Sequence, residues 1–186
     1  MAQRAIELAG DGSRLEVVFS QDEIAARLSA LAREIADLSL GNLIVVAVLK
    51  GSFVFAADLI RALHAVRVTP EVDFITLSSY RRSTISSGTV DILRDIELDV
   101  TDRHVLLVDD VLDSGRTLAY AKDLLSARGA RSIRTCVLLD KQVTRAVQLE
   151  ADLKAFACPD MFVVGYGMDI AHRFRELPFV GRLVTQ

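Results

Sequence analysis

The stretch V-L-L-V-D-D-V-L-D-S-G-R-T-L-A-Y-A, residues 105–121, decides the fold. Four apolar residues lead into the paired carboxylates Asp109 and Asp110, and a third carboxylate, Asp113, follows before a short loop and a segment with helical character. An apolar run of this kind predicts a strand buried on both faces. Open α/β sheets bind ligands beyond the carboxyl ends of their strands, so this stretch predicts an α/β protein with an anionic ligand at that edge.

The sequence on either side alternates strands with helices. A capping box at residues 20–23 opens an amphipathic helix that ends at Gly41, and a continuous apolar run at 43–49 follows. We expect the elements after it to be strands at 72–80, 103–110, 132–139, 160–166 and 181–184, helices at 53–66 and 117–128, and a helical turn at 143–148. This order predicts an α/β fold with a mainly parallel twisted sheet and helices on both faces.

Composition sets broad limits on function. The chain has 186 residues, which favours one domain, and its net charge of −3 argues against a general nucleic-acid or membrane-surface binder. Cys136 and Cys158 lack a metal-ligand spacing, and two cysteines are too few for a disulfide scaffold. The N-terminus lacks the pattern of a signal peptide, and the apolar runs are too short to span a bilayer. We expect a cytoplasmic protein with no membrane partner.

The loop at 113–117 has the chemistry of a phosphate site. Backbone N–H groups between a strand and a helix form an anion-binding nest, and the helix N-terminus adds partial positive charge. Gly115 permits close backbone approach, while Ser114, Arg116 and Thr117 supply donors. The spaced glycines and the lysine of a P-loop are missing. The alternative is that Ser114 or Asp113 only caps the helix.

The adjacent carboxylates of Asp109 and Asp110 need partners because they repel each other. They would bind a divalent cation, accept hydrogen bonds from two sugar hydroxyls, or do both. Neighbouring side chains on a regular strand point to opposite faces, so we expect the chain to bend here if both serve one ligand. Next to a phosphate loop, the pair indicates a site for a ribose 5-phosphate.

The motif V-L-L-V-D-D-V-L-D-S-G-R-T resembles the phosphoribosyl-pyrophosphate motif of the type I phosphoribosyltransferases, in particular their 6-oxopurine branch, the hypoxanthine-guanine phosphoribosyltransferases. Matching segments follow in the right order: V-L-K-G-S-F-V-F at 48–55, S-S-Y at 78–80, L-L-D-K at 138–141 and F-V-V-G-Y-G-M-D at 162–169. The resemblance covers nearly the whole chain. It implies one domain over residues 1–186, with a small base-binding hood formed by residues 160–186 and the N-terminal segment.

Asp113 distinguishes this branch, because relatives that act on adenine or orotate, or regulate pyrimidine operons, usually carry no carboxylate there. The resemblance implies that Asp113 lies near N7 of the purine and takes its proton as N9 attacks the ribose. It also places the ribose hydroxyls on Asp109 and Asp110. The 5-phosphate is assigned to Asp113, Ser114, Gly115, Arg116 and Thr117.

The resemblance assigns the base to residues from two later segments. Lys141 would donate to the exocyclic O6, which favours a 6-oxo over a 6-amino purine because lysine has no acceptor. Phe162 would stack on the base, Val163 would bind its edge through the backbone, and Asp169 would lie beside it. A solvated lysine, core residues for Phe162 and Val163, and a turn aspartate are the alternatives.

The pyrophosphate is assigned to Lys50, Gly51 and Arg175. In the family the peptide bond that matches Lys50–Gly51 can be cis, whereas an ordinary turn with a surface lysine is the alternative. A solvated arginine is the alternative for Arg175. The implied cofactor is Mg²⁺ carried by the pyrophosphate, with Asp169 as its ligand and the Asp109–Asp110 pair as further candidates.

Residues 79–91 form a polar loop that the resemblance identifies as a lid, with Ser79 and Tyr80 at its base. Closing such a lid excludes water from a reactive ribosyl centre. Arg81 and Asp91 depart from the glycine and lysine that are common in bacterial relatives. The departures concern lid movement and pyrophosphate contact at its tip rather than the core chemistry.

The resemblance implies purine salvage: transfer of the 5-phosphoribosyl group from phosphoribosyl pyrophosphate to N9 of hypoxanthine or guanine, giving IMP or GMP and pyrophosphate. It also implies a homodimer or homotetramer. One alternative is a transferase that prefers xanthine. The other is a regulatory protein on the same fold that senses phosphoribosyl pyrophosphate and binds nucleic acid.

Overall fold

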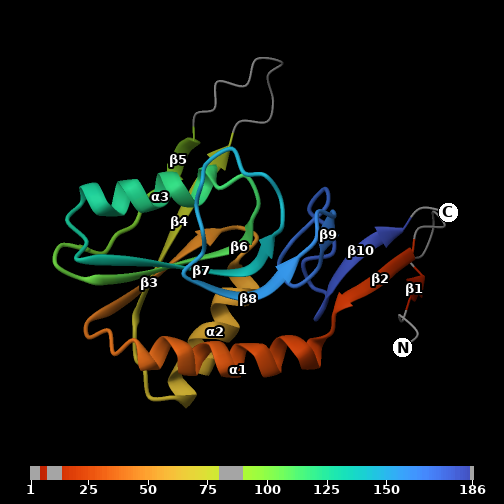
Figure 1. The fold of residues 1–186 in the computed structure, drawn as a ribbon, viewed down its shortest axis with the longest axis horizontal. Coiled ribbons are helices and arrows are strands. Elements are labelled where there is room, and N and C mark those ends of the chain that lie inside the picture. Colours follow the sequence, from red (N-terminus) through yellow and green to blue (C-terminus); the bar gives the residue numbers. More distant parts are fainter. Residues whose placement is uncertain (1–4, 8–13, 80–89, 185–186) are drawn as a thin grey trace.

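A six-stranded central sheet forms the body of the protein in the computed structural model, which describes residues 5–7, 14–79 and 90–184. The strand order is β5-β4-β3-β6-β7-β8 (Figure 1). The bounds are β3 Leu43–Leu49, β4 Glu71–Ser79, β5 Val90–Arg94, β6 His104–Leu112, β7 Ser132–Lys141 and β8 Leu153–Cys158. Every neighbouring pair is parallel except β4 and β5, which are antiparallel. The predicted mainly parallel sheet is confirmed.

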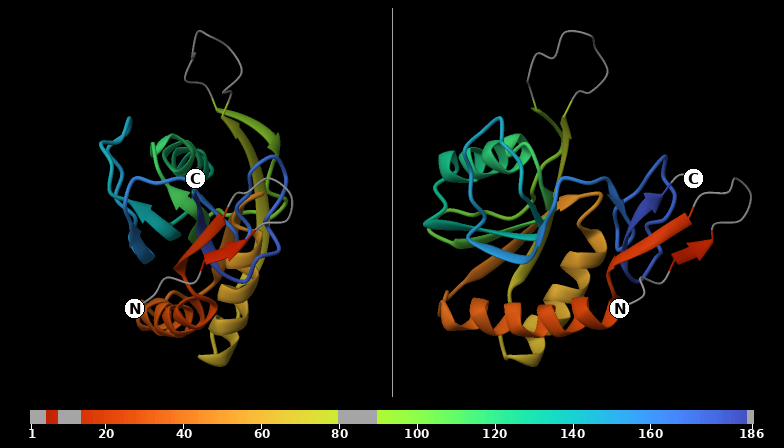
Figure 2. Two further views of the ribbon diagram at one scale, coloured as in Figure 1. Left: turned by 90° about the vertical axis from the view of Figure 1, so that its right-hand side faces the viewer. Right: turned by 45° about the vertical axis from the view of Figure 1, so that its right-hand side comes forward.

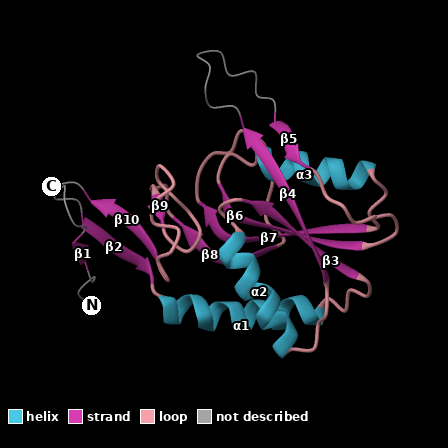
Figure 3. Ribbon diagram, turned by 180° about the vertical axis from the view of Figure 1, so that it is seen from behind, coloured by secondary structure: helices cyan, strands magenta, loops and turns pink. Residues whose placement is uncertain are grey.

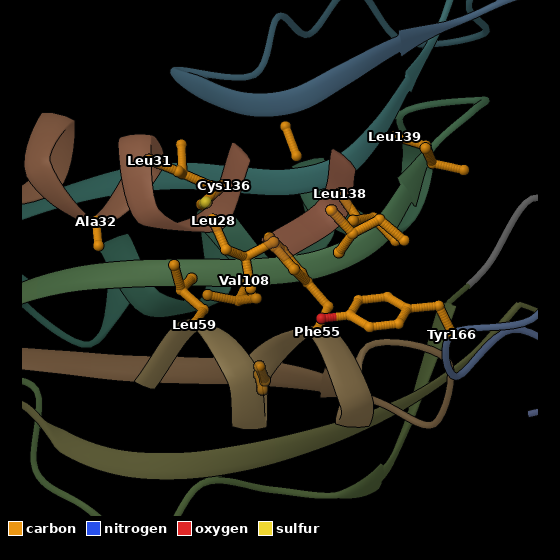
Figure 4. Close-up of a cluster of buried hydrophobic side chains, with 14 of the residues drawn as sticks. Leu28, Leu31, Ala32, Phe55, Leu59, Val108, Cys136, Leu138, Leu139 and Tyr166 are labelled. Carbon is orange, nitrogen blue, oxygen red and sulfur yellow. The ribbon is translucent and has the colours of Figure 1, made fainter. Parts of the chain in front are cut away.

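Helices cover both faces of this sheet. The helices α1 (Gln21–Asp37) and α2 (Phe53–Ala65) lie on one face, and α3 (Arg116–Ala127) lies on the other (Figures 1 and 3). The sheet therefore separates two apolar clusters, one beneath α1 and α2 and one beneath α3. Figure 4 shows the first cluster, in which side chains of α1 and α2 meet Val108, Cys136 and Leu138 of the sheet.

The start of α1 follows the predicted capping box. The hydroxyl of Ser20 accepts a hydrogen bond from the Glu23 amide at 3.3 Å, and the Ser20 amide donates to the Glu23 carboxylate at 2.8 Å. Its buried stripe is Ile24, Leu28, Leu31, Ala32 and Ile35. The predicted helix over the same stretch is confirmed.

The chain ends contribute a second, antiparallel sheet, which we call the terminal sheet. Its order is β1-β2-β10-β9, with bounds Ala5–Glu7, Arg14–Phe19, Val180–Val184 and Val163–Val164. An ion pair at 2.5 Å joins Arg182 of β10 to Glu16 of β2. Figure 2 shows the terminal sheet beside the central sheet, beyond the first turn of α1. The carboxyl ends of β3, β6 and β7 face the ligand cavity described below.

Several predicted boundaries are wrong. Strand β6 is predicted to end at residue 110 but continues to Leu112, so Asp109 and Asp110 lie inside the strand rather than at its end. Residues 143–148 contain no helical turn. The expected strand at 160–166 is reduced to the two residues of β9, whereas β1, β2, β5 and β8 were not predicted. The last two residues of the predicted lid, 90 and 91, belong to β5.

No helix in the described ranges is long and apolar enough to cross a membrane.

Candidate active site

A cavity of about 360 Å³ opens at the carboxyl ends of β3, β6 and β7. It is the place where open parallel sheets bind ligands. The predicted site residues that line it are Lys50, Gly51, Asp109, Asp110, Asp113, Ser114, Gly115, Thr117, Lys141, Phe162, Val163 and Asp169. Segments that are more than one hundred residues apart in the sequence therefore meet around one space, as the sheet topology predicts.

Asp109 and Asp110 both line this cavity although β6 stays paired with β7 at Asp109 and again at Val111. The Asp109 carboxylate accepts a hydrogen bond from the Asp110 amide at 2.9 Å, and the Asp110 carboxylate accepts one from the Val111 amide at 3.0 Å. Burial, followed by repulsion from Asp110, raises the pKa of Asp109 well above its ordinary value. Burial also raises the pKa of Asp110. The pair is thus suited to a ligand that brings positive charge or hydroxyl donors.

The loop after β6 presents backbone to the cavity rather than a side-chain cap. The N-cap of α3 is Gly115, at a φ of 79°, and no side chain makes a hydrogen bond to cap this helix. The interpretation of Ser114 or Asp113 as the helix cap is therefore wrong. Arg116 is exposed and does not line the cavity, unlike its neighbours. The first turn of α3 thus keeps the free N–H groups of a helix N-terminus, and such groups can bind an anion.

The segment after β7 packs against this loop from outside. The Val147 amide donates to the Ser114 carbonyl at 3.1 Å. A Cβ added to Gly115 would lie 2.7 Å from the Val147 carbonyl oxygen. Glycine is therefore required at 115 by the positive φ and by the neighbouring backbone together.

Lys141 and Asp113 form a pair inside the cavity. The Nζ of Lys141 lies 3.2 Å from the Oδ2 of Asp113, and the two side chains are 12% and 47% exposed. Lys141 is the last residue of β7, whereas Asp113 follows β6, so parallel pairing of the two strands brings them together. A base in contact with both side chains would meet a donor and an acceptor.

Phe162 is not a core residue, because its side chain is 57% exposed at the cavity. Val163 begins β9 and is buried. The terminal sheet thus supplies an apolar wall opposite the polar groups of the central sheet, as expected for a flat heterocycle.

Gly51 lies against Asp110 at the other end of the cavity. A Cβ at Gly51 would fall 1.7 Å from Oδ2 of Asp110, so the position accepts only glycine while that carboxylate stays in place. The cis peptide bond of this turn joins Leu49 to Lys50. Whether the bond between Lys50 and Gly51 is cis was open in the sequence, and the structure has the cis bond one residue earlier.

Asp169 and Arg175 are tied to each other. Their carboxylate and guanidinium lie 2.7 Å apart, and Arg175 also donates to the Gly167 carbonyl at 2.7 Å. The Asp169 carboxylate accepts a further hydrogen bond from the His172 amide at 2.8 Å. Asp169 lines the cavity, whereas Arg175 is not among the lining residues. Asp169 is therefore not a free turn aspartate, and Arg175 is not a solvated arginine.

Among the described residues, no group of three or more histidine, cysteine or acidic side chains is arranged to hold a metal ion. Mg²⁺ is, however, usually held by one or two carboxylates with substrate phosphates and waters, rather than by a cage of protein groups. Asp109, Asp110 and Asp169 fit that mode, since all three reach the same cavity.

Most of the predicted lid, residues 80–89, lies outside the described residues. Tyr80 and Arg81 lie outside the described residues, and Ser79 is placed only as the last residue of β4. Asp91 is exposed on β5.

Residues that support the site were missed in the sequence. Asp140 is buried beside Lys141 and is paired with Arg145 and, at 2.5 Å, with Lys154. An acidic residue late in an apolar strand was a usable signal, but its partners come from the irregular segment after β7 and from the edge strand β8, neither of which was predicted.

Comparisons with known proteins agree with this geometry. The family described as "Phosphoribosyl transferase domain" matches residues 18–171. The chain is 41% identical over 173 residues to "Hypoxanthine phosphoribosyltransferase" of Escherichia coli, covering 91% of this chain and 96% of that protein. The relative of the same name in Buchnera aphidicola is 40% identical with the same coverage.

A solved structure of a hypoxanthine-guanine phosphoribosyltransferase from Bacillus anthracis superposes with a TM-score of 0.83 at 39% identity, covering 90% of this chain and 98% of that one. The match to a family profile, the identity of full-length relatives and the shared fold lead to one assignment: the chain belongs to the hypoxanthine phosphoribosyltransferase family.

Proposed function

We propose that this protein transfers the 5-phosphoribosyl group from phosphoribosyl pyrophosphate to N9 of hypoxanthine or guanine, giving IMP or GMP and pyrophosphate. The observation that carries the proposal is the Lys141–Asp113 pair, 3.2 Å apart, in one cavity with the buried Asp109–Asp110 pair and the open N-terminus of α3. These groups are complementary to a 6-oxopurine, a ribose and a phosphate.

The base would lie between Phe162 and the polar wall of the cavity. Lys141 offers donors only, so it selects a carbonyl at position 6 over an amino group. The exposed ring of Phe162 provides a stacking surface, and the backbone of Val163 provides polar groups at the base edge. Base selectivity then depends on hydrogen bonds that an adenine would leave unpaired.

The phosphoribosyl group would occupy the opposite wall. The N–H groups of residues 114–117 receive the 5-phosphate, with the hydroxyls of Ser114 and Thr117 beside them. Arg116 is exposed outside the cavity, so we assign it charge attraction rather than direct contact. Asp109 and Asp110 accept from the two ribose hydroxyls.

The reaction breaks the bond between C1′ and the pyrophosphate oxygen while N9 forms a bond to C1′. As the base nitrogen gains positive character, the N7 proton becomes acidic and passes to the Asp113 carboxylate. The carboxylates of Asp109 and Asp110 stabilise positive charge that develops on the ribose. Lys141 holds O6 and thereby orients the base.

Pyrophosphate would leave past Lys50, Gly51 and Asp169. Bound Mg²⁺ supplies charge neutralisation of the leaving group. Asp169, and the Asp109–Asp110 pair across the cavity, are the residues that would hold it. Arg175 acts here through Asp169 and Gly167, because it contacts both and is not among the residues that line the cavity.

We also propose that Ser79, Tyr80 and the loop after them close over the bound substrates and exclude water. A cytoplasmic homodimer or homotetramer without a nucleic-acid partner completes the proposal.

A pyrophosphate-release assay with hypoxanthine, guanine, xanthine and adenine, each with and without Mg²⁺, tests the function. We expect turnover with hypoxanthine and guanine, a Mg²⁺ requirement, and little activity with adenine. Faster turnover with xanthine would reassign the base. Absence of turnover with all four bases, together with tight nucleic-acid binding at physiological salt, would support the regulatory alternative.

A further inference from the structure

The loop between β9 and β10 holds an unusual backbone. Four residues other than glycine have positive φ in it: Tyr166 at 51°, Ala171 at 49°, His172 at 67° and Phe174 at 76°. Side chains with a Cβ adopt this region at a cost in free energy, because the Cβ crowds the backbone. Such a loop keeps its shape only when contacts to the rest of the fold hold it.

Tyr166 supplies a contact of this kind. Its hydroxyl donates to the Oδ2 of Asp58, on α2, at 2.5 Å, and its amide donates to the Leu177 carbonyl at 2.9 Å. The residue is 5% exposed, and its ring extends over α2 beside Phe55 (Figure 4). Burial raises the pKa of the Tyr166 phenol, so the hydroxyl remains a donor at neutral pH.

Helix α2 also positions Lys50 and Gly51, which we call the pyrophosphate turn. The amide of Phe53, the first residue of α2, donates to the Lys50 carbonyl at 3.2 Å. The hydroxyl of Ser52 is buried and donates to the Val48 carbonyl at 2.5 Å. Lys50 and Gly51 are therefore fixed to the start of α2, one and a half turns before Asp58.

The two segments then meet directly. A Cβ on Gly167 would lie 2.3 Å from the Gly51 carbonyl oxygen, so the loop backbone rests on the pyrophosphate turn. Arg175 binds the Gly167 carbonyl and the Asp169 carboxylate together. A shift of Tyr166 would move Gly167 away from Gly51, and Asp169 with it.

We propose that Tyr166 and Asp58 are positioning residues that hold Asp169 and the pyrophosphate turn in register, so that the pyrophosphate half of the cavity is assembled before substrate arrives. This inference rests on the proposed function for the assignment of that half to pyrophosphate. It predicts a selective effect: the pyrophosphate end depends on the Tyr166–Asp58 hydrogen bond, whereas the base end, built on Lys141 and Phe162, does not.

The test begins with Tyr166→Phe, which removes one oxygen and keeps the ring. We expect a rise of roughly 3- to 10-fold in KM for phosphoribosyl pyrophosphate and in the Kd of Mg-pyrophosphate measured by calorimetry, from loss of a hydrogen bond to a carboxylate. The KM for hypoxanthine should change by less than about twofold. Tyr120→Phe, the same change on α3, is the matched control.

Variants of Asp58 separate this role from general support. Asp58→Ala should reproduce the effect of Tyr166→Phe, and the double variant should be no worse than either, because one interaction is lost in all three. Asp58→Asn keeps an acceptor for the Tyr166 hydroxyl. Its affinity for Mg-pyrophosphate should therefore be closer to that of the wild type than to that of Asp58→Ala. Arg61→Ala controls for the ion pair that Asp58 makes with exposed Arg61. If Tyr166→Phe does not fold, Asp58→Ala carries the test.

Hydrogen exchange gives a readout that needs no activity. The amides of Gly167 and Phe53 are bonded to the carbonyls of Arg175 and Lys50, and both should exchange faster in Tyr166→Phe but not in Tyr120→Phe. Unchanged exchange at both amides, or equal rises in KM for the two substrates, would overturn the inference. Lack of wild-type turnover with any purine would instead count against the proposed function, and the exchange result would still decide the coupling.

Discussion

Asp113 is half exposed and in contact with Lys141, so it is free to meet a ligand while its orientation is restrained. Replacing it with asparagine keeps an oxygen that accepts from Lys141 but removes the ability to take a proton. We expect Asp113→Asn to lower kcat by roughly 10²–10⁴-fold, with KM for phosphoribosyl pyrophosphate within about threefold. Steady-state kinetics measure both. Asp123→Asn, on an exposed part of α3, is the control, and unchanged turnover in Asp113→Asn would refute the catalytic role.

Because the Asp109 carboxylate is buried, we expect the substitution Asp109→Asn to raise stability and lower activity. Its pKa is raised in the folded state, so the folded protein binds this proton more tightly than the unfolded chain does. Ionisation therefore costs stability as pH rises above the ordinary value of about 4, and the cost is complete above the folded pKa. Asp109→Asn removes that cost while it weakens the ribose site.

We expect ligand-free Asp109→Asn to be more stable than the wild type by about 1–2 kcal/mol at pH 8, with little difference near pH 4. Urea unfolding at the two pH values measures the difference. Turnover at pH 8 should fall by at least about a hundredfold, because a charged acceptor at the ribose is lost. A stability difference that is the same at both pH values would show that ionisation is not its cause.

The sequence predicted which residues line the candidate site where side-chain chemistry and strand order determine their position. Asp109, Asp113 and Lys141 each end or follow an apolar run, and parallel pairing gathers such positions at one edge. The sequence did not locate the cis bond between Leu49 and Lys50 or the ion pair of Arg175 with Asp169. Both depend on local backbone geometry and on contacts between segments, which the sequence pattern does not specify.

At the scale of elements, the segment 142–150 shows where periodicity misleads. Val143 and Val147, four residues apart, favour a helical turn, but the chain is held irregular by Arg145. The Arg145 guanidinium donates to the Asp140 carboxylate, to the Lys141 carbonyl at 2.9 Å and to the Leu149 carbonyl at 2.8 Å. Carbonyl groups that a helix would satisfy internally are bound by this side chain instead.

Arg145 consequently supports the phosphate loop, since the segment it holds carries Val147 against Ser114 and Gly115. We expect Arg145→Met to lower the free energy of unfolding by about 3 kcal/mol, because it removes one partner of a buried carboxylate. Arg134→Met removes the ion pair of a half-exposed arginine with Asp152 and should cost less than about 1 kcal/mol. Urea unfolding compares the two variants.

The kinetics of Arg145→Met should separate the phosphate from the base. KM for phosphoribosyl pyrophosphate should rise more than KM for the base in Arg145→Met, whereas Arg134→Met should leave both unchanged. Equal losses of stability in the two variants would argue against a buried network around Asp140.

Across the whole molecule, the predictable part of the fold is its parallel centre. Strands β3, β6 and β7 are buried on both faces and read as apolar runs, so sequence alone placed them and the edge where the cavity lies. Strands β5 and β8 are edge strands with mixed burial, and β1, β2 and β9 are short and pair only through distant partners. Their pairing depends on tertiary contacts rather than on local pattern.

The cavity draws on both sheets, and this arrangement predicts how a nucleotide stabilises the protein. The phosphate loop and Lys141 follow or end strands of the central sheet, whereas Phe162 and Val163 lie at the start of β9 in the terminal sheet. A nucleotide in the cavity would therefore contact both sheets. A ligand present at one hundred times its Kd stabilises the folded state by about 2.7 kcal/mol. For a chain of this size we expect GMP at that concentration to raise Tm by roughly 5–10 °C.

AMP at the same concentration should raise Tm much less than GMP, because its 6-amino group offers no acceptor to Lys141. Differential scanning fluorimetry measures both shifts. Phe162→Ala should reduce the GMP shift while it leaves the shift with ribose 5-phosphate unchanged, since only the purine contacts the exposed ring. Equal shifts with GMP and AMP would show that the base end of the cavity does not discriminate, and would remove Lys141 from its assigned place at O6.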